Sequence, residues 1–417
     1  MEQNDKGREV DEEETMAYCL LHLPLGECKA TFNLEKAVCN HGFFMMAPNL
    51  WIPSTKTLQR PLRLADSTTS VTVSISHPHN HTCLHVRVQG TRHVPSADQQ
   101  VILEQVARML RISEKDERNM RAFQRVHSRA KEKGFGRVFR SPTLFEDCVK
   151  CILLCNCTLM RALNMARDLC KLQSELTVGL ISHILEPQPN GEEFISNTMR
   201  KGLKRKQCTK KKNVKTKMRR KEATNIPSKV NKCVEANLNL QMSESNAPQL
   251  GNFPSSKELA ALNEEILKNH CKLGYRARSI LELARKFERG NLELDKFGKG
   301  FDMAYEKVYE KLMKIKGFGP FACANVKMCT GFYQEVPVDS ETLRHMREMH
   351  GRESCNKGTI GNDVREIYEK YAPFQCLAYW LELWEYYENK FGKLSELPNS
   401  EYHTVTGSFK NGKMICP

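Results

Sequence analysis

Residues 312–345 read LMKIKGFGPFACANVKMCTGFYQEVPVDSETLRH, and this stretch guides the interpretation of the rest of the chain. An amphipathic helical pattern ends at the Gly317-Phe318-Gly319 turn. A second helical pattern starts at Pro320, a position where the missing proline N–H costs little. The extended segment Val336-Pro337-Val338 then delivers one acid, Asp339. The stretch predicts a helix, a glycine hairpin, a second helix and a carboxylate, in that order.

The hairpin and the acid each permit two interpretations. A two-glycine turn at a helix N-terminus gathers backbone N–H groups into an anion site suited to a DNA phosphate, but it also suits a tight corner between helices. Asp339 at the start of a helix over residues 340–345 can be a reacting carboxylate, or it can be an N-cap. For an acid considered in isolation, the N-cap is the favoured interpretation.

Charge is concentrated in one part of the chain. The 417 residues carry a formal net charge of +15, and residues 200–221 contain thirteen Lys or Arg and no acid, so the remainder carries 15 − 13 = +2. This run lies in a polar stretch, residues 173–248, which predicts a disordered basic insert. Clusters such as Lys204-Arg205-Lys206 are typical of a nuclear localisation signal. We therefore expect the nucleus as the location, and the nuclear import machinery as a partner.

The cysteines are expected to be free thiols rather than disulfides or metal ligands. The N-terminus is acidic and lacks the apolar core of a signal peptide, and no run is apolar enough to span a membrane. Cys148, Cys151 and Cys155 recur at helical spacing, which favours a buried face over a zinc site. The His77-Pro78-His79-Asn80-His81 segment favours a solvated turn over a metal site. No metal or cofactor is expected.

The overall pattern predicts an α+β fold. Alternating residues, Val71, Val73 and Ile75 and then Leu84, Val86 and Val88, indicate a hairpin in a small antiparallel β-rich N-terminal region. From residue 96 the period changes to about 3.6, which indicates a mainly helical domain against which this region packs. The expected divisions are an acidic disordered tail (1–14), the β-rich region (15–95), the helical domain (96–172 with 249–395), the insert (173–248) and a loosely ordered tail (396–417).

The hairpin and the acid together resemble the helix-hairpin-helix, Gly/Pro-Asp (HhH-GPD) superfamily of DNA glycosylases. The motif KGFGPFACANVKM followed by VPVD carries the resemblance, and PTLFEDCVKCILLCNCTLMRALNMARDLC and KLGYRARSILELARKF extend it. These segments look like the 8-oxoguanine DNA glycosylase branch. The resemblance covers about residues 25–172 and 249–390, interrupted by the basic insert.

The resemblance implies roles for individual residues. Asp339 would be the catalytic carboxylate, and the hairpin Gly317, Phe318 and Gly319 would hold a DNA phosphate. Asn156 and Tyr275 would fill the gap left by a flipped base, and Arg161 and Arg276 would contact the opposite base. From the residues alone, Arg161 is equally consistent with a surface charge, and Asn156 with a helix C-cap. The implied base pocket comprises Phe321, Asn325, Cys329, Cys376 and Trp380, with His41-Gly42-Phe43 from the β-rich region.

Three positions depart from the branch. Phe321 stands where bifunctional members have a lysine that attacks the sugar, and phenylalanine has no nucleophile. The inducible bacterial alkyladenine glycosylase also has an aromatic residue there. Cys376 stands where the oxidised-guanine pocket uses a glutamine, and Asn325 where it uses a cysteine.

The expected function is therefore that of a monofunctional DNA N-glycosylase of base excision repair. It would flip a damaged, oxidised purine out of duplex DNA and remove it, without lyase activity. The expected partner is double-stranded DNA with a damaged base, and the expected state is a monomer with no membrane association. The alternatives are an alkylated-base glycosylase and a catalytically silent DNA-binding module. The acid at Asp339 separates enzyme from binder, because a negative charge beside the phosphodiester backbone weakens binding.

Overall fold

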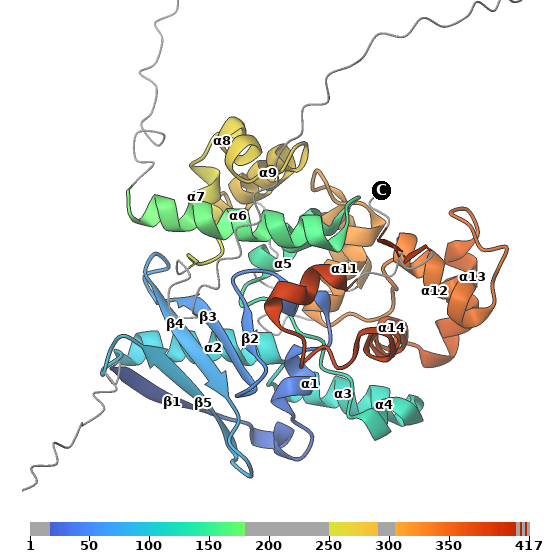
Figure 1. Ribbon diagram of the computed structural model, residues 1–417, viewed down its shortest axis with the longest axis horizontal. Coiled ribbons are helices and arrows are strands. Elements are labelled where there is room, and N and C mark those ends of the chain that lie inside the picture. The colour runs from blue at the N-terminus through green and yellow to red at the C-terminus, as the bar shows by residue number, and fades with distance from the viewer. Residues whose placement is uncertain (1–16, 180–249, 291–304, 406–408, 411–412, 415–417) are drawn as a thin grey trace, which may run out of the picture. The chain divides into compact units, whose positions relative to one another are not determined.

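The computed structural model describes residues 17–179, 250–290, 305–405, 409–410 and 413–414 (Figure 1). The chain divides into two units, residues 1–185 with 250–417, and residues 186–249. The second unit, and with it the basic run at 200–221, lies outside the described residues, as does the acidic tail at 1–14. In the part of the chain that is described, no helix combines the length and apolarity needed to cross a membrane.

The β-rich region is a five-stranded antiparallel sheet in the order β1-β5-β4-β3-β2. The expected hairpin is confirmed by β4 and β5, whose alternate residues Val73, Ile75, Leu84, Val86 and Val88 are fully buried. Helix α2 packs against β1 and β3 (Figure 1). The strands are β1 (Tyr18–Pro24), β2 (Leu50–Ile52), β3 (Thr57–Arg63), β4 (Ser70–Ser76) and β5 (Cys83–Gln89), and a separate two-stranded ribbon pairs β6 (Phe409–Lys410) with β7 (Lys413–Met414).

Helices make up the rest of the described chain, which confirms the α+β class. The helices are α1 (Leu34–Val38), α2 (Ser96–Leu110), α3 (Glu114–Val126), α4 (Ser128–Lys133), α5 (Leu144–Leu154), α6 (Leu159–Thr177), α7 (Ser256–Ala260), α8 (Glu264–His270), α9 (Arg276–Glu288), α10 (Tyr305–Met313), α11 (Pro320–Thr330), α12 (Ser340–His350), α13 (Ile360–Tyr368) and α14 (Gln375–Phe391). The opening motif thus forms α10, the hairpin, α11 and the start of α12.

The charged segment over residues 114–133 forms two helices, α3 and α4. His127 leaves helical geometry (φ −135°, ψ 93°), and its ring nitrogen accepts the Ala130 N–H at 3.2 Å. This side chain caps α4 and separates it from α3, in the way that Ser or Asp caps more often do. Of the cysteines expected on one buried face, Cys148 and Cys151 are fully buried in α5, whereas Cys155 is half-buried at its C-cap.

The segments on either side of the undescribed residues 180–249 lie together. Helix α6 continues to Thr177, five residues past the expected boundary at 172. Near its end, Gln173 accepts the Asn252 N–H at 2.8 Å and donates to Glu258 at 3.1 Å. The chain therefore leaves and returns to one place on the helical domain.

The C-terminal segment around residues 394–405 has a defined position against the β-rich region. Trp51 donates its indole N–H to the Ser395 carbonyl at 2.8 Å, and Ser395 donates its hydroxyl to Glu35 at 2.5 Å. Tyr402 is buried with its ring edge-on to Phe44 at 5.4 Å. This part of the expected loosely ordered tail is therefore packed in place.

Candidate active site

The hairpin before α11 requires glycine at its first position. Gly317 has φ +91°, in the left-handed region, and a Cβ there would lie 2.7 Å from both Cβ and Oγ of Ser279 in α9. No other residue type combines that backbone angle with so close an approach. Phe318 is buried, and its N–H donates to the Ile315 carbonyl at 3.1 Å. The hairpin is thus locked against α9 on one side.

The N-terminus of α11 carries no side-chain cap. Its N-cap residue is Gly319, and Pro320 occupies the first helical position. Within the described residues, no hydrogen bond uses the N–H of Gly319 or of Phe321. These donors, at the positive end of the helix dipole, are arranged to accept an anion from outside the protein.

Basic side chains surround the hairpin. Lys316 lies 3.3 Å from Glu282, which also pairs with Arg278 at 3.0 Å, so two cations share one acid. Lys286 donates to the carbonyl of Lys314 at 3.2 Å, which adds two further lysines on this side. The local excess of positive charge would favour an anion at the helix N-terminus.

The opposite end of α11 is fixed by two arginines. Arg111 donates to the Met328 carbonyl at 2.8 Å, and Arg140 donates to the Cys329 carbonyl at 2.7 Å. Both pair with Asp116, at 3.2 and 3.4 Å. Burial opposes its ionisation, but the two arginines lower the pKa of Asp116 to about 2. Cations at helix C-terminal carbonyls are favourable, so these residues anchor the helix that carries the hairpin.

Asp339 is the N-cap of α12, and its two carboxylate oxygens differ. Oδ1 accepts the N–H of Glu341 and of Thr342, both at 2.9 Å, and the Thr342 hydroxyl lies at 3.1 Å. Oδ2 makes no hydrogen bond within the described part of the chain. The residue as a whole is exposed, although protein atoms pack around its carboxyl group. The N-cap interpretation is therefore confirmed, and the second oxygen remains available to a ligand.

The surroundings of Asp339 disfavour its charge. Burial of the carboxyl raises the pKa of Asp339 above its ordinary value, and the hydrogen bonds from Thr342 and Glu341 only partly offset this. Thr342, fully buried, also contacts the Tyr379 hydroxyl at 3.1 Å and donates to the Pro337 carbonyl at 2.8 Å. Thr342 thus links the Asp339 carboxylate to Tyr379 of α14.

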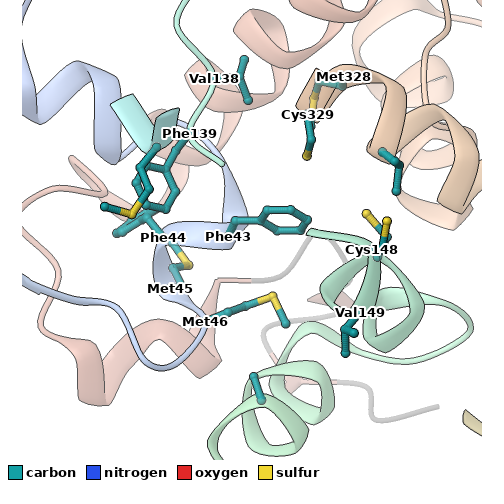
Figure 2. Close-up of a cluster of buried hydrophobic side chains, with 14 of the residues drawn as sticks. Phe43, Phe44, Met45, Met46, Val138, Phe139, Cys148, Val149, Met328 and Cys329 are labelled. Atoms are coloured by element: carbon teal, nitrogen blue, oxygen red, sulfur yellow. The ribbon is translucent and has the colours of Figure 1, made fainter. Parts of the chain in front are cut away.

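The residues expected to form a base pocket do come together. The His41 ring lies edge-on to Trp380 at 4.4 Å and to Phe43 at 4.6 Å. Figure 2 shows the Phe43 ring pointing between Cys329 of α11 and Cys148 of α5. All three of these side chains are fully buried. The centre of the expected pocket is therefore a packed apolar cluster in this structure.

Exposure divides the expected pocket residues into two groups. Asn325, Cys329 and Cys376 are buried, and Asn325 donates its amide to the Phe321 carbonyl at 3.0 Å. Phe321 and Trp380 are partly exposed. Only the second group can contact a ligand without movement of neighbouring side chains.

Buried charges lie beneath the apolar cluster. Glu146 pairs with Arg60 at 3.0 Å and with Lys150 at 2.7 Å, and the Lys150 ammonium lies 5.9 Å from the centre of the Phe43 ring. Burial, together with the positive charges of Arg111 and Lys150, lowers the pKa of His41 to about 3. His41 is therefore neutral and presents an uncharged ring to Trp380.

Three of the four expected gap-filling and opposite-base residues are adjacent. The Asn156 amide lies 3.5 Å from the Tyr275 hydroxyl, and Tyr275 is 61% exposed. Asn156 has φ +49°, the left-handed conformation that asparagine tolerates just past a helix end, and it follows Cys155, which is the C-cap of α5. Arg276 is buried and donates to the carbonyls of Cys155 and Asn156. Arg161 is exposed on α6, and its charge and that of Arg276 both act on the nearby Cys157 thiol.

The structure adds supporting residues that sequence reasoning missed. Thr342 has a local signal, because a threonine three residues after an acidic N-cap is a capping-box pattern. Tyr379, Arg111 and Arg140 have no such signal, since their partners lie 37 to 217 residues away in the sequence.

No protein-family model and no curated protein matches this sequence. Among solved structures, a 3-methyladenine DNA glycosylase from Archaeoglobus fulgidus is similar, with 15% identity and a TM-score of 0.48 over 89% of this chain and 99% of the other. An 8-oxoguanine glycosylase/lyase from Clostridium acetobutylicum, in complex with double-stranded DNA containing cytosine opposite 8-oxoguanine, is similar at 12% identity and a TM-score of 0.42, over 79% of this chain and 88% of the other. Neither of these two scores reaches 0.5, so the function is inferred from the site itself.

Proposed function

We propose that the protein is a monofunctional DNA N-glycosylase that removes a damaged purine base from duplex DNA. One observation carries the proposal: Asp339 has one oxygen held by backbone N–H groups and one oxygen without a protein partner in the described residues. A fixed carboxylate with one free oxygen, twenty residues after a hairpin whose N–H groups could hold a phosphate, is suited to reaction at a nucleotide sugar.

The chemistry follows from the position of the charge. Cleavage of the N-glycosidic bond builds oxocarbenium-like positive charge on the sugar, and the free oxygen of Asp339 would stabilise that charge. The bond between C1′ and the base breaks, the base departs with the bonding electrons, and water adds to C1′. The raised pKa of Asp339 makes its carboxylate a better acceptor for the proton that this water loses.

We expect no covalent intermediate between a lysine amine and the sugar. Phe321 occupies the place of the nucleophilic lysine in the superfamily that the motif resembles. Lys327, on the same helix, is buried, pairs with Glu335 at 2.7 Å and lies 4.4 Å from the centre of the Tyr309 ring. A paired ammonium is a poor nucleophile, so Lys327 does not substitute for the missing lysine.

The proposed substrate is an oxidised, guanine-derived base opposite cytosine. Exposed Tyr275 beside Asn156 supports insertion into a DNA stack, and exposed Arg161 supports a contact with the opposite strand. Arg276 donates to the carbonyls of Cys155 and Asn156, so it would act on the DNA only by positioning this loop. The second candidate, an alkylated purine, is favoured by the aromatic residue at Phe321 and by the burial of Cys376 where a glutamine would read an oxidised guanine.

The test compares wild type with Asp339→Asn on duplexes containing 8-oxoguanine, 3-methyladenine, hypoxanthine or uracil opposite cytosine. We expect release of 8-oxoguanine by wild type only, and no adduct on borohydride trapping. Release of 3-methyladenine alone would select the second candidate. Tight lesion binding by both proteins with no base release would identify a catalytically silent binder, and a trapped adduct would overturn the monofunctional assignment.

We further propose that the basic run at residues 200–221 directs the protein to the nucleus. A deletion of this run should abolish nuclear accumulation of a fluorescent fusion and reduce non-specific DNA affinity in low salt, because its thirteen positive charges release counterions on binding. The rate of base release at saturating protein should stay unchanged. Loss of that rate would mean that the run belongs to the working domain.

A further inference from the structure

Two histidines from the middle and the C-terminal end of α12 converge with a glutamate of α14. His345 and His350 come from α12, and Glu382 comes from α14. Their Nε2 atoms lie 3.1 and 2.9 Å from the same Glu382 oxygen, Oε2. One potential ligand atom from each residue lies within 4.8 Å of the other two.

Three polar groups crowd one oxygen of Glu382, and two of them, His350 Nε2 and the Tyr368 hydroxyl, also lie 3.2 Å from each other. Tyr368 of α13 also donates its hydroxyl to Oε2, at 2.5 Å, so three donors compete for an oxygen that has two lone pairs. The His345 side chain is fully buried, and its Nδ1 finds no hydrogen-bond partner in the described residues. A cation between the two rings and the carboxylate would replace the two His–Glu hydrogen bonds and leave Oε2 with the tyrosine alone.

We propose that His345, His350 and Glu382 bind a divalent transition-metal ion, with zinc as the best match. Two imidazole nitrogens and one carboxylate oxygen are a common zinc donor set. Bond lengths of about 2.0–2.1 Å place neighbouring ligands of a tetrahedral ion about 3.3 Å apart, close to the His–Glu distances observed. Tyr368 then acts as a positioning residue that orients the carboxylate from behind.

The fourth coordination position would face an open cavity of about 530 Å³, which His350 and Glu382 line. Three protein ligands with one open position leave room for a water molecule or an oxygen ligand. The ion would join α12 to α14, and α12 carries Asp339 at its other end. The inference stands independently of the proposed glycosylase activity, because metal binding is measured without DNA.

A second group provides the matched control. His22, Cys83 and His85, on the paired strands β1 and β5, also have ligand atoms within 4.8 Å of one another. This group lies on the sheet surface, with His22 exposed, and it contains a thiol that the proposed site lacks. Cobalt distinguishes the two groups, because only a thiolate ligand gives an intense sulfur-to-cobalt charge-transfer band.

The experiment titrates the full-length, untagged, chelator-treated protein with Co²⁺, followed by competition with Zn²⁺. We expect one tightly bound equivalent with weak visible bands, no thiolate band and displacement by Zn²⁺. His350→Ala should weaken affinity at least ~100-fold and Tyr368→Phe ~10-fold, whereas His22→Ala should leave it unchanged. Zn²⁺ should raise the Tm of wild type but not of His350→Ala, whose folding is checked by circular dichroism. Glu382→Gln keeps the size of the side chain, so it repeats the test without creating a cavity.

Three results would overturn the assignment: no tight binding by wild type, unchanged affinity in both His350→Ala and Glu382→Gln, or a thiolate band that His22→Ala removes. The last result would place the ion on the sheet surface instead.

Discussion

Helices α11 and α12 begin in opposite ways. The first turn of α11 follows Gly319, which has no side chain, and its leading N–H groups are unpaired within the described residues. The first turn of α12 follows Asp339, whose Oδ1 satisfies two N–H groups at 2.9 Å. One helix start is prepared to accept a negative charge from outside, and the other supplies its own. The pair therefore offers an end with unpaired N–H groups, the proposed phosphate site, and an acidic end within twenty residues of chain.

The largest expected effect comes from removal of the charge at the acidic end. Asp339→Asn keeps an oxygen that caps α12, but it loses the negative charge that stabilises the transition state. We expect the single-turnover rate of base release to fall by about 10³-fold. Because burial raises the pKa of Asp339, the ionised acid costs stability as the pH rises through that folded pKa, so the variant should be at least as stable as wild type at neutral pH. A normal rate in a folded variant would place the chemistry elsewhere.

The next largest effect, on duplex binding, is expected when α11 is given an acidic N-cap like that of α12. Gly319 has φ −112°, and a Cβ there meets nothing within 4 Å, so Gly319→Asp fits without strain. The new carboxylate should cap α11 and stabilise the fold by about 0.5 kcal/mol, yet weaken duplex binding by about tenfold, since it occupies the phosphate site. Fluorescence anisotropy and thermal unfolding measure the two quantities. Gly319→Asn, which caps without charge, is the control and should lose less affinity.

A smaller effect is expected two residues earlier, on stability. Gly317→Ala forces a side chain into φ +91° and against Ser279, so the free energy of unfolding should fall by about 1–3 kcal/mol in urea titrations. Adding Ser279→Gly removes the atoms that the new Cβ would meet, and it should restore the steric part only. Full stability in the single variant would mean that the hairpin is not locked as described.

The smallest effect concerns the support of the acid. Thr342→Val removes a hydrogen bond that lowers the pKa of Asp339, so that pKa should rise further. Since the reaction needs the ionised acid, the acidic limb of the rate profile should move to higher pH, with a loss of about 1 kcal/mol of stability. Thr359→Val, at the start of α13, is the control for loss of a hydroxyl near a helix end and should leave the profile in place. An unshifted profile in Thr342→Val would separate Thr342 from the chemistry.

Local patterns predicted much of this architecture. Alternation located β4 and β5, glycine spacing located the hairpin, and the N-cap interpretation of Asp339 was correct. Contacts between side chains that are distant in the sequence could not be predicted from local patterns. His127 ends one helix and caps the next through its ring, and the expected pocket residues Cys329 and Cys376 are buried by neighbours from distant segments. The His345, His350 and Glu382 group combines spacings of 5 and 32 residues that match no helical or strand period.

The contact between Trp51 and Ser395 joins residues 344 positions apart, and it has a consequence for biosynthesis. The strand that carries Trp51 leaves the ribosome long before its partner does. The sheet can pair early, because its five strands all lie within residues 18–89, but the indole N–H cannot reach its acceptor until residue 395 has been made. This hydrogen bond therefore forms only after residue 395 has been made, and a chain that stops before that residue would leave the buried Trp51 N–H without its acceptor.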